Sequence, residues 1–184
     1  MDENIARVLV QLPEHLAALV EFLALTGWRK SEATGLTWSQ IDFNAVTIRL
    51  EPGTTKSGAG RVFPFLAHPA LGRLFVEQGE RVLAMQRGKG AVIPWVFLRP
   101  DGRRIGQFHK QWTKACRAAG CPGRLVHDLR CTAVRNLVRA GVNEKVAMAL
   151  AGFKTRAVFD RYHIVSEADL AEAVRKLGER SSGS

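Results

Sequence analysis

The apolar positions near the N-terminus repeat with the period of a helix. Pro13 and Glu14 suit a first helical turn, and the apolar residues that follow recur at i, i+3, i+4 and i+7. Gly27 interrupts this pattern, and residues 29–36 have the pattern of a short second helix. The predicted apolar face of the first helix consists of Leu16, Leu19, Val20 and Leu23.

A period of two replaces the helical period further along the chain. Val46, Ile48 and Leu50 alternate with polar residues, and residues 61–65 offer a partner strand. Between them lies EPGTTKSGAG, whose glycines predict a mobile hairpin tip. The sequence therefore predicts a small antiparallel sheet.

The rest of the chain is mostly helical in pattern. Residues 69–86 place Leu71, Leu74, Phe75, Val82 and Leu83 at helical spacing. The run VIPWVFL fits either a helix or a strand, and the dipeptide DG at 101–102 indicates a turn. From residue 106 onward we expect successive helices. Expected C-caps are Gly120, Gly141, Gly152 and Gly178, and expected N-caps are Asn143, Thr155 and Ser166.

These patterns predict a mainly α fold with a small antiparallel β-sheet (α+β). We expect one domain over residues 1–178 and a disordered tail over 179–184. No apolar run approaches the length of a membrane span, and the first residues lack the features of a signal peptide.

Charge narrows the class of partner. Lys and Arg number 27 against 17 Asp and Glu, which gives a formal net charge of +10. A surplus of this size points to a polyanion, with nucleic acid first; a solvated basic surface without a partner is the alternative. Cys116, Cys121 and Cys131 form neither an even disulfide framework nor a zinc-ligand spacing, which favours a reducing cytoplasm.

The segment VHDLRCTAVRNL contains a candidate phosphate site. His127 and Arg130 are three residues apart at the start of a predicted helix, so they share a face. If Asp128 is the N-cap, free N–H groups and the positive end of the helix dipole lie beside them, which suits a phosphate. The alternative is a surface helix that carries an unrelated His and Arg.

Two further segments supply cations. Arg29 and Glu32 are spaced to form an ion pair that would orient the guanidinium for bidentate phosphate binding, although such a pair is often only a surface contact. Lys56 lies in GTTKSGAG, which lacks the Walker A pattern and a following helix. A hairpin lysine of this kind suits a point charge or a proton donor.

The single tyrosine, Tyr162, stands in RAVFDRYH among cations. A tyrosine that attacks phosphorus needs cations around the phosphoryl oxygens and an acid for the departing oxygen. The carboxylates form no cluster that would hold two metal ions, so the sequence predicts no metal cofactor.

The order of these motifs resembles the catalytic domain of the tyrosine recombinase (phage integrase) family. The matching segments are TGWRKSEATGLTWSQID, TKSGAGRVFPF, HDLR and LAGFKTRAVFDRY, and FHKQWTKACRAAG is also similar. The resemblance covers about residues 13–165.

The resemblance implies a role for each matching residue. Tyr162 would attack the scissile phosphodiester to form a 3′-phosphotyrosyl link and free a 5′-hydroxyl, without metal or ATP. Arg29 and Arg130 would grip the non-bridging oxygens. Lys56 would be the general acid and His127 would assist proton transfer. Glu32 and Phe153 are expected to support the site, and Thr55, Arg61 and Lys154 to contact DNA.

One position departs from the family pattern. The residue nine before the tyrosine is usually His or Trp in the family, and here it is Phe153, which has no hydrogen-bond donor. Loss of one donor would cost on the order of 10²–10³ in rate unless another group, such as Lys154, compensates.

The resemblance also implies partners. The expected partner is double-stranded DNA, with a homo-tetramer on DNA for a full-length protein and a monomer for an isolated domain. The catalytic-type sequence begins almost at residue 1, so we expect the family's N-terminal DNA-clamping domain to be absent, and residues 166–178 resemble a C-terminal helix that docks on a neighbour. The alternatives are a non-catalytic DNA-binding module and an enzyme like type IB topoisomerases.

Overall fold

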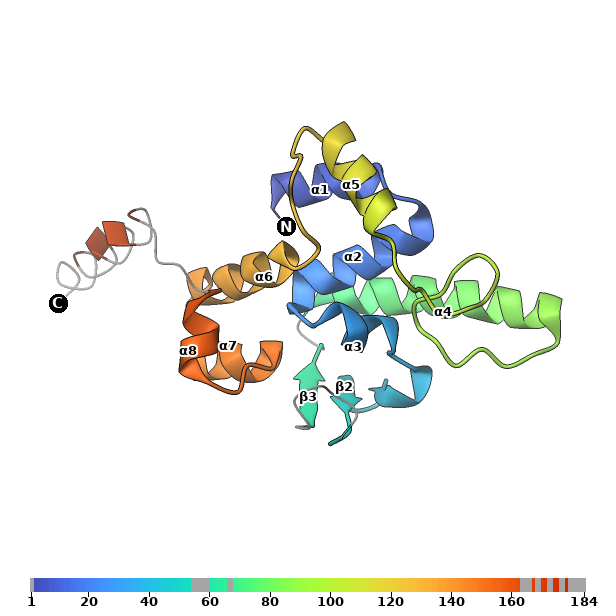
Figure 1. The fold of residues 1–184 in the computed structure, drawn as a ribbon. Coiled ribbons are helices and arrows are strands. Elements are labelled where there is room, and N and C mark those ends of the chain that lie inside the picture. The colour runs from blue at the N-terminus through green and yellow to red at the C-terminus, as the bar shows by residue number, and fades with distance from the viewer. Residues whose placement is uncertain are drawn as a thin grey trace.

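The described part of the chain is built mainly from helices. In this computed structural model it comprises residues 2–53, 60–65 and 68–162, and beyond these only positions 167, 170, 171, 174, 175 and 178. The α-helices are α1 (Glu3–Val10), α2 (Glu14–Thr26), α3 (Lys30–Thr34), α4 (Pro69–Lys89), α5 (His109–Ala118), α6 (Asp128–Arg139), α7 (Glu144–Ala151) and α8 (Arg156–Asp160) (Figure 1). The 3-10 helix η1 (Trp38–Gln40) precedes the strands β1 (Ile41–Asp42), β2 (Thr47–Leu50) and β3 (Arg61–Pro64).

Helix α2 lies at the centre of the fold. It packs against α1, α3, α4 and α6, and the four residues of its predicted apolar face are all buried. Phe22 adds an aromatic contact on each side, with ring centroids 5.4 Å from Trp28 and 5.2 Å from Phe97. Burial of these side chains is the main stabilising contribution to the fold.

The predicted antiparallel sheet is confirmed. Its strand order is β1-β2-β3, and Ile48 of β2 faces Phe63 of β3. Ile48 and Leu50 are buried while Arg49 is exposed, as the alternation predicts. Strand β1 has only two residues, too few to show a period of two in the sequence.

The C-terminal helices form a smaller core beside α2. Asn143 caps α7 and Thr155 caps α8 through their side-chain oxygens, as predicted. Gly152 ends α7 with φ of +75°. The buried residues of this core are Val134, Ala147, Ala151, Phe153 and Phe159.

Three features differ from the sequence predictions. Helix α1 was not predicted, although Asp2 caps it and Ile5 and Val8 are buried. Leu83 is 56% exposed, whereas the helical pattern placed it on the inner face of α4. The ambiguous run 92–98 contains no helix, and its Trp95 forms an antiparallel bridge with Thr37.

Several predictions fall outside the described residues. These are Ser166 as an N-cap, most of the helix after it, the tail over 179–184 and positions 54–59 of the hairpin tip. Within the described residues, no helix combines the length and apolar character that crossing a bilayer requires.

Candidate active site

Arg29 and Glu32 are held together at the start of α3. Gly27 ends α2 in the left-handed conformation, φ +66°, and the chain turns through Trp28 so that Arg29 becomes the N-cap of α3. Glu32 accepts a bond from the Arg29 backbone N–H at 3.0 Å and one from its guanidinium at 2.9 Å. The side chain of Glu32 is 3% exposed, so the pair is not the surface contact that the sequence left open.

A second arginine reaches the same carboxylate. Arg61, at the start of β3, donates to Glu32 Oε2 at 2.6 Å, and its own side chain is 7% exposed. Burial alone would raise the pKa of Glu32, but the charge of Arg61 and hydrogen bonds from Arg29 and Arg61 outweigh it and hold this pKa below its usual value. Glu32 is therefore an ionised carboxylate between two guanidinium groups.

Arg130 projects from α6 into the turn that joins α7 to α8. It is 3% exposed, and its NH1 donates to the carbonyl oxygens of Gly27 at 2.5 Å and Ala151 at 2.6 Å. A longer bond of 3.4 Å joins NH2 to Gly152 O. Within the described part of the chain these bonds use three of the five guanidinium N–H groups, which leaves two for a ligand. Burial and the nearby charge of Arg29 lower the pKa of Arg130 to about 10, so it stays protonated at neutral pH.

Tyr162 follows Arg161, the C-cap of α8, and its side chain contacts His127 at the start of α6. Its hydroxyl is 2.5 Å from His127 Nε2. The tyrosine ring packs on Phe153, with centroids 4.9 Å apart, and Phe153 in turn lies 3.9 Å below the guanidinium carbon of Arg130. Burial, with the charges of Arg130 and Arg29, lowers the pKa of His127, although Asp128 opposes this shift.

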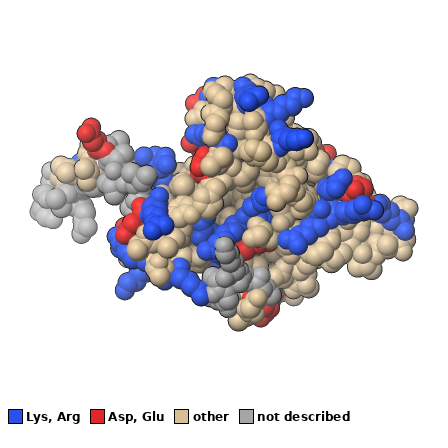
Figure 2. Space-filling view, viewed as in Figure 1, with Lys and Arg blue, Asp and Glu red and all other residues tan. Residues whose placement is uncertain are grey.

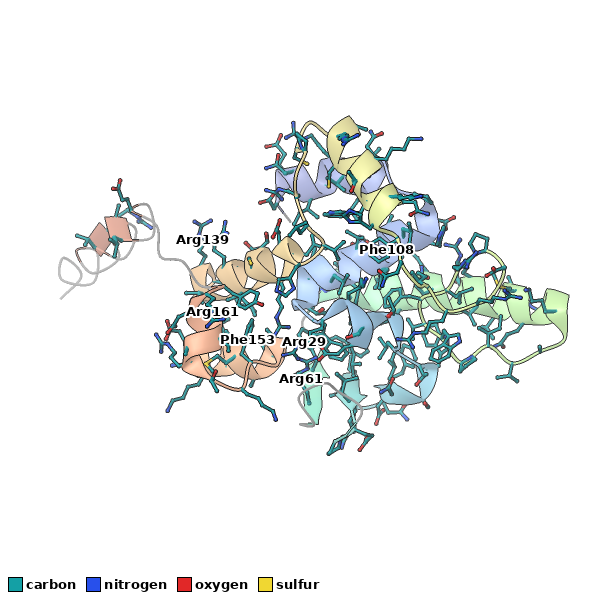
Figure 3. All side chains as sticks on the ribbon, viewed as in Figure 1. Arg29, Arg61, Phe108, Arg139, Phe153 and Arg161 are labelled. Carbon is teal, nitrogen blue, oxygen red and sulfur yellow. The ribbon has the colours of Figure 1, made fainter. Side chains whose placement is uncertain are left out.

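Gly152 joins these two groups of residues. Its carbonyl accepts from Arg130, and the guanidinium of Arg61 lies so close that a Cβ at this position would overlap it. Arg29, Glu32 and Arg61 on one side and Arg130, Phe153 and Tyr162 on the other therefore share one corner of the molecule, where Figure 3 shows Arg29, Arg61 and Phe153 near one another. A pocket of about 250 Å³ adjoins this corner, and its lining includes Trp28, Lys30, His127 and Arg130.

The structure thus brings together six of the residues that the sequence singled out for chemistry. These are Arg29, Glu32, His127, Arg130, Phe153 and Tyr162. Lys154 is exposed beside Phe153. Lys56 and Thr55 lie outside the described residues.

Two predicted features are placed differently. Asp128 is not the N-cap of α6, because the chain is already helical at His127 and the Asp128 carboxylate instead accepts from Leu125 N–H at 2.7 Å. The prediction that Asp128 is the N-cap was therefore wrong. Its carboxylate caps the turn that precedes the helix, at Leu125, instead of the helix itself. Arg61, expected to contact DNA, is buried against Glu32.

Sequence reasoning missed the main-chain groups that position Arg130. The carbonyl oxygens of Gly27, Ala151 and Gly152 hold its guanidinium. The signal available was the pair of glycines at 27 and 152, which end helices and leave carbonyl groups without helical partners. What the sequence does not reveal is that both helix ends face one side chain.

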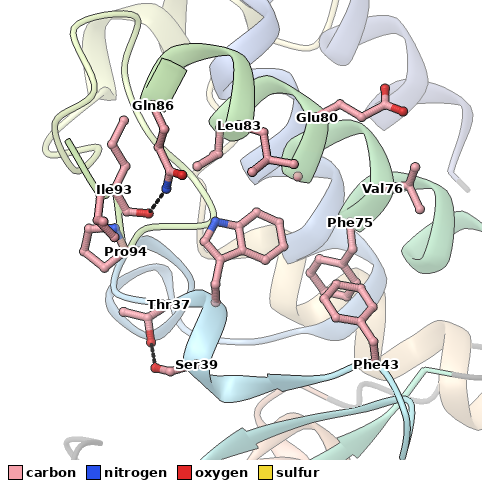
Figure 4. Close-up of a pocket in the computed structure, with 14 residues that line it drawn as sticks. Thr37, Ser39, Phe43, Phe75, Val76, Glu80, Leu83, Gln86, Ile93 and Pro94 are labelled. Carbon is pink, nitrogen blue, oxygen red and sulfur yellow. Dashed lines mark hydrogen bonds between the residues drawn. The ribbon is translucent and has the colours of Figure 1, made fainter. Parts of the chain in front are cut away.

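A larger cavity lies elsewhere, between α4 and the segments 37–43 and 92–94 (Figure 4). It measures about 670 Å³ and is mostly apolar, with Trp38, Phe43, Val76 and Leu83 among its walls. It lacks the converging cations of the first site. Among the described residues, no three His, Cys, Asp or Glu side chains come together as a metal-binding group.

Basic side chains gather on one face of the molecule. Figure 2 shows Lys and Arg side chains in a band that crosses the middle of this face and continues to the far end of α4. Acidic side chains are scattered at its edges. A tyrosine hydroxyl, a histidine and converging guanidinium groups beside a basic surface are what a tyrosine-based phosphoryl-transfer protein requires.

Comparison with known proteins identifies the family. The model of the phage integrase family matches residues 3–168, and the chain belongs to this family. It is 29% identical to the integrase of Salmonella phage P22 over 93% of this chain and 44% of that protein. It is 32% identical to the tyrosine recombinase XerC of Bifidobacterium longum over 82% of this chain and 43% of that protein.

Solved structures confirm the fold. The XerA recombinase superposes with a TM-score of 0.78 at 18% identity, covering 96% of this chain and 63% of that one. The XerH site-specific recombinase, in a post-cleavage complex with palindromic difH substrate, gives 0.68 at 17% identity, covering 94% and 51%. The chain spans less than half the length of the two curated relatives named above.

Proposed function

We propose that this chain is the catalytic part of a site-specific DNA recombinase or integrase. It would cleave and rejoin DNA strands through a covalent link between Tyr162 and a 3′-phosphate. The observation that carries the proposal is the contact of the Tyr162 hydroxyl with His127 at 2.5 Å, beside the guanidinium of Arg130. Membership in the phage integrase family supports it.

The proposed reaction is a phosphoryl transfer in two steps. Tyr162 Oη forms a bond to the scissile phosphorus, the bond from phosphorus to the 5′-oxygen breaks, and the tyrosine proton passes to His127 Nε2. The 5′-oxygen takes a proton, for which Lys56 is the proposed donor. Reversal with another strand's 5′-hydroxyl rejoins the DNA, and since the phosphodiester count is unchanged, neither ATP nor water is consumed.

The arginines are proposed to stabilise the transition state. Negative charge builds on the non-bridging oxygens as the tyrosine attacks, and fixed cations in a desolvated site stabilise it strongly. Arg130 keeps two N–H groups for this purpose, and Arg29, whose side chain is 29% exposed, can reach the same phosphate. Glu32 orients Arg29, and Phe153 shapes the wall of the site.

Double-stranded DNA is the proposed partner. The net charge of +10 and the basic band on this face match a polyanion, and the XerH site-specific recombinase, which has a similar fold, is bound to palindromic difH substrate. We propose that Lys154 and Thr55 contact the DNA backbone. A tetramer on DNA, a monomeric state of this domain alone and a cytoplasmic location also stay predictions.

The test is formation of a covalent protein–DNA adduct. The wild-type chain is incubated with a suicide substrate, a duplex nicked near the cleavage site so that the short 5′-ended fragment diffuses away. We expect a band that resists denaturation and is absent in Tyr162→Phe. Lack of any adduct at saturating DNA would favour a non-catalytic binding module. Relaxation of supercoils without sequence preference would favour a topoisomerase-like activity.

A further inference from the structure

Arg61 is one of the most enclosed cations of the site. Its guanidinium carbon lies 4.4 Å from the centre of the Trp28 ring, and its NH2 group donates to Glu32 at 2.6 Å. On a third side it abuts Gly152, where a Cβ would overlap the guanidinium. An aromatic face, a carboxylate and a backbone corner therefore fix this side chain.

This enclosure is not what a DNA-contacting arginine needs. The side chain is only 7% exposed, and its NH2 group is already bonded to Glu32. Its Nε is buried and has no hydrogen-bond partner among the described residues. A buried unsatisfied donor and a desolvated charge weaken a fold, so stability alone does not account for an arginine here.

We propose that Arg61 is a positioning residue for strand cleavage, acting through Glu32 on Arg29. The inference rests on the proposed function. Arg61 holds one oxygen of Glu32, while the other oxygen holds the guanidinium of Arg29. With both oxygens engaged, the carboxylate cannot rotate, and the Arg29 fork is presented in one orientation to the scissile phosphate.

The charges explain why two arginines are needed on one carboxylate. Burial disfavours ionised Glu32, and the charge of Arg61 is the largest effect that opposes burial. Without Arg61, the Glu32 carboxylate would be less ionised, and its Oε2 atom would keep only the bond from the Arg29 backbone N–H. Glu32 would then hold the Arg29 guanidinium less firmly, although the charge of Arg29 would remain in the site.

The experiment separates positioning from DNA contact. Arg61→Met keeps the stem over Trp28 and removes the charge, and it is compared with Glu32→Gln and with the double variant. Arg49→Met is the matched control, because Arg49 is an exposed cation on the neighbouring strand β2. Each protein is assayed for DNA affinity across a salt series and for the single-turnover rate of adduct formation on the nicked substrate.

The expected result is a selective loss of rate. Arg61→Met slows adduct formation on the order of 10- to 100-fold, since a small misplacement of a catalytic group costs this much. Its DNA affinity and salt slope match those of Arg49→Met. In the Glu32→Gln background, Arg61→Met causes little further loss. Arg61→Lys, which retains the charge, serves as a second variant if Arg61→Met does not fold. The loss of rate that Arg61→Lys causes must be absent when Glu32→Gln is also present.

Two results would overturn the inference. One is a salt slope that falls by about one unit in Arg61→Met but not in Arg49→Met, which marks a direct phosphate contact. The other is a rate loss that multiplies with that of Glu32→Gln, which shows independent action. If the wild type forms an adduct and either of these results is found, only the proposed role of Arg61 is wrong. If the wild type forms no adduct, the proposed function itself is contradicted.

Discussion

Phe153 is the residue at which the sequence resemblance predicted a departure from the family pattern. Its ring lies between the guanidinium of Arg130, at 3.9 Å, and the ring of Tyr162, at 4.9 Å. A cation over a desolvated aromatic face is stabilised by about 2 kcal/mol. The Phe153 ring therefore packs against both Arg130 and Tyr162, and it offers no hydrogen-bond donor.

Two substitutions separate the donor from the stack. Phe153→His restores a donor on an aromatic ring, and we expect adduct formation at least as fast as in the wild type. Phe153→Leu keeps an apolar side chain but removes the ring, and we expect slower adduct formation with the unfolding free energy lowered by about 2 kcal/mol or more, because the contact with Arg130 is lost along with buried ring volume. Single-turnover rates and denaturant unfolding are the measurements. A large fall for Phe153→His would show that packing by phenylalanine is the dominant contribution.

The lowered pKa of His127 leads to a prediction for the pH dependence of cleavage. Its pKa lies below the ordinary 6.5, chiefly through burial and Arg130, so the neutral ring that accepts the Tyr162 proton is favoured at pH 7. As pH falls below 6.5 and passes this lowered pKa, the ring becomes protonated, and if His127 is the proposed proton acceptor we expect adduct formation to slow. Rates between pH 5 and 8 test this.

His15 provides the control for that profile, because burial and Arg81 lower its pKa also. His15→Gln should leave the inflection unchanged, and His127→Gln should remove it. A rate that rises as pH falls through this range would contradict the role of neutral His127 as proton acceptor.

At the scale of elements, two helix ends create the pocket for Arg130. Helices α2 and α7 end in left-handed glycines, and carbonyl oxygens from both ends bind its guanidinium. The carbonyl oxygens at these helix ends have no partner within their own helix, so they are available to accept hydrogen bonds from Arg130. Gly152, at the end of α7, also adjoins Arg61, so that this one residue lies next to both Arg130 and Arg61.

Substitution of Gly152 should therefore lower the free energy of unfolding more than substitution of a left-handed glycine that has no close neighbours. Gly152→Ala and Gly141→Ala both place a side chain at positive φ, at +75° and +80°, which costs about 1–2 kcal/mol each. Only at Gly152 does the new Cβ meet Arg61, whereas nothing lies within 4 Å at Gly141. Denaturant unfolding should show a larger loss for Gly152→Ala. Equal losses would contradict the close packing of Arg61.

The sequence predicted these elements better than it predicted their contacts. Periodicity indicated α2, β2, β3 and α4, and capping residues indicated α7 and α8, because both signals are local. Helix α1 was not predicted, although its N-cap Asp2 is a local signal of the same kind. The 56% exposure of Leu83 was not predictable, since burial depends on what packs opposite.

The same limit applied to the site. The motif order indicated Arg29, His127, Arg130 and Tyr162, and the structure groups them. The burial of the Arg61 side chain, at 7% exposure, depends on Trp28 and Glu32 from one segment and on Gly152 from another, both far from Arg61 in the sequence. No spacing within one segment reveals such a contact.

At the scale of the whole molecule, net charge is the property that would govern the proposed encounter with DNA. A formal charge of +10 with a basic band on the face of the site predicts affinity dominated by counterion release. If about five phosphates are neutralised, affinity should fall about 10²- to 10³-fold between 50 and 200 mM salt. Fluorescence anisotropy with duplexes of specific and random sequence would measure it. Affinity that is independent of salt for both duplexes would contradict a DNA-binding role for this face.

The chemical identity of the covalent link tests the central claim most directly. The adduct is digested with nuclease and protease, and the modified peptide is sequenced by mass spectrometry. We predict a nucleotide 3′-phosphate on the oxygen of Tyr162, and a 5′-hydroxyl on the released strand. A nucleotide on any other residue, or cleaved ends with no protein attached, would contradict the account.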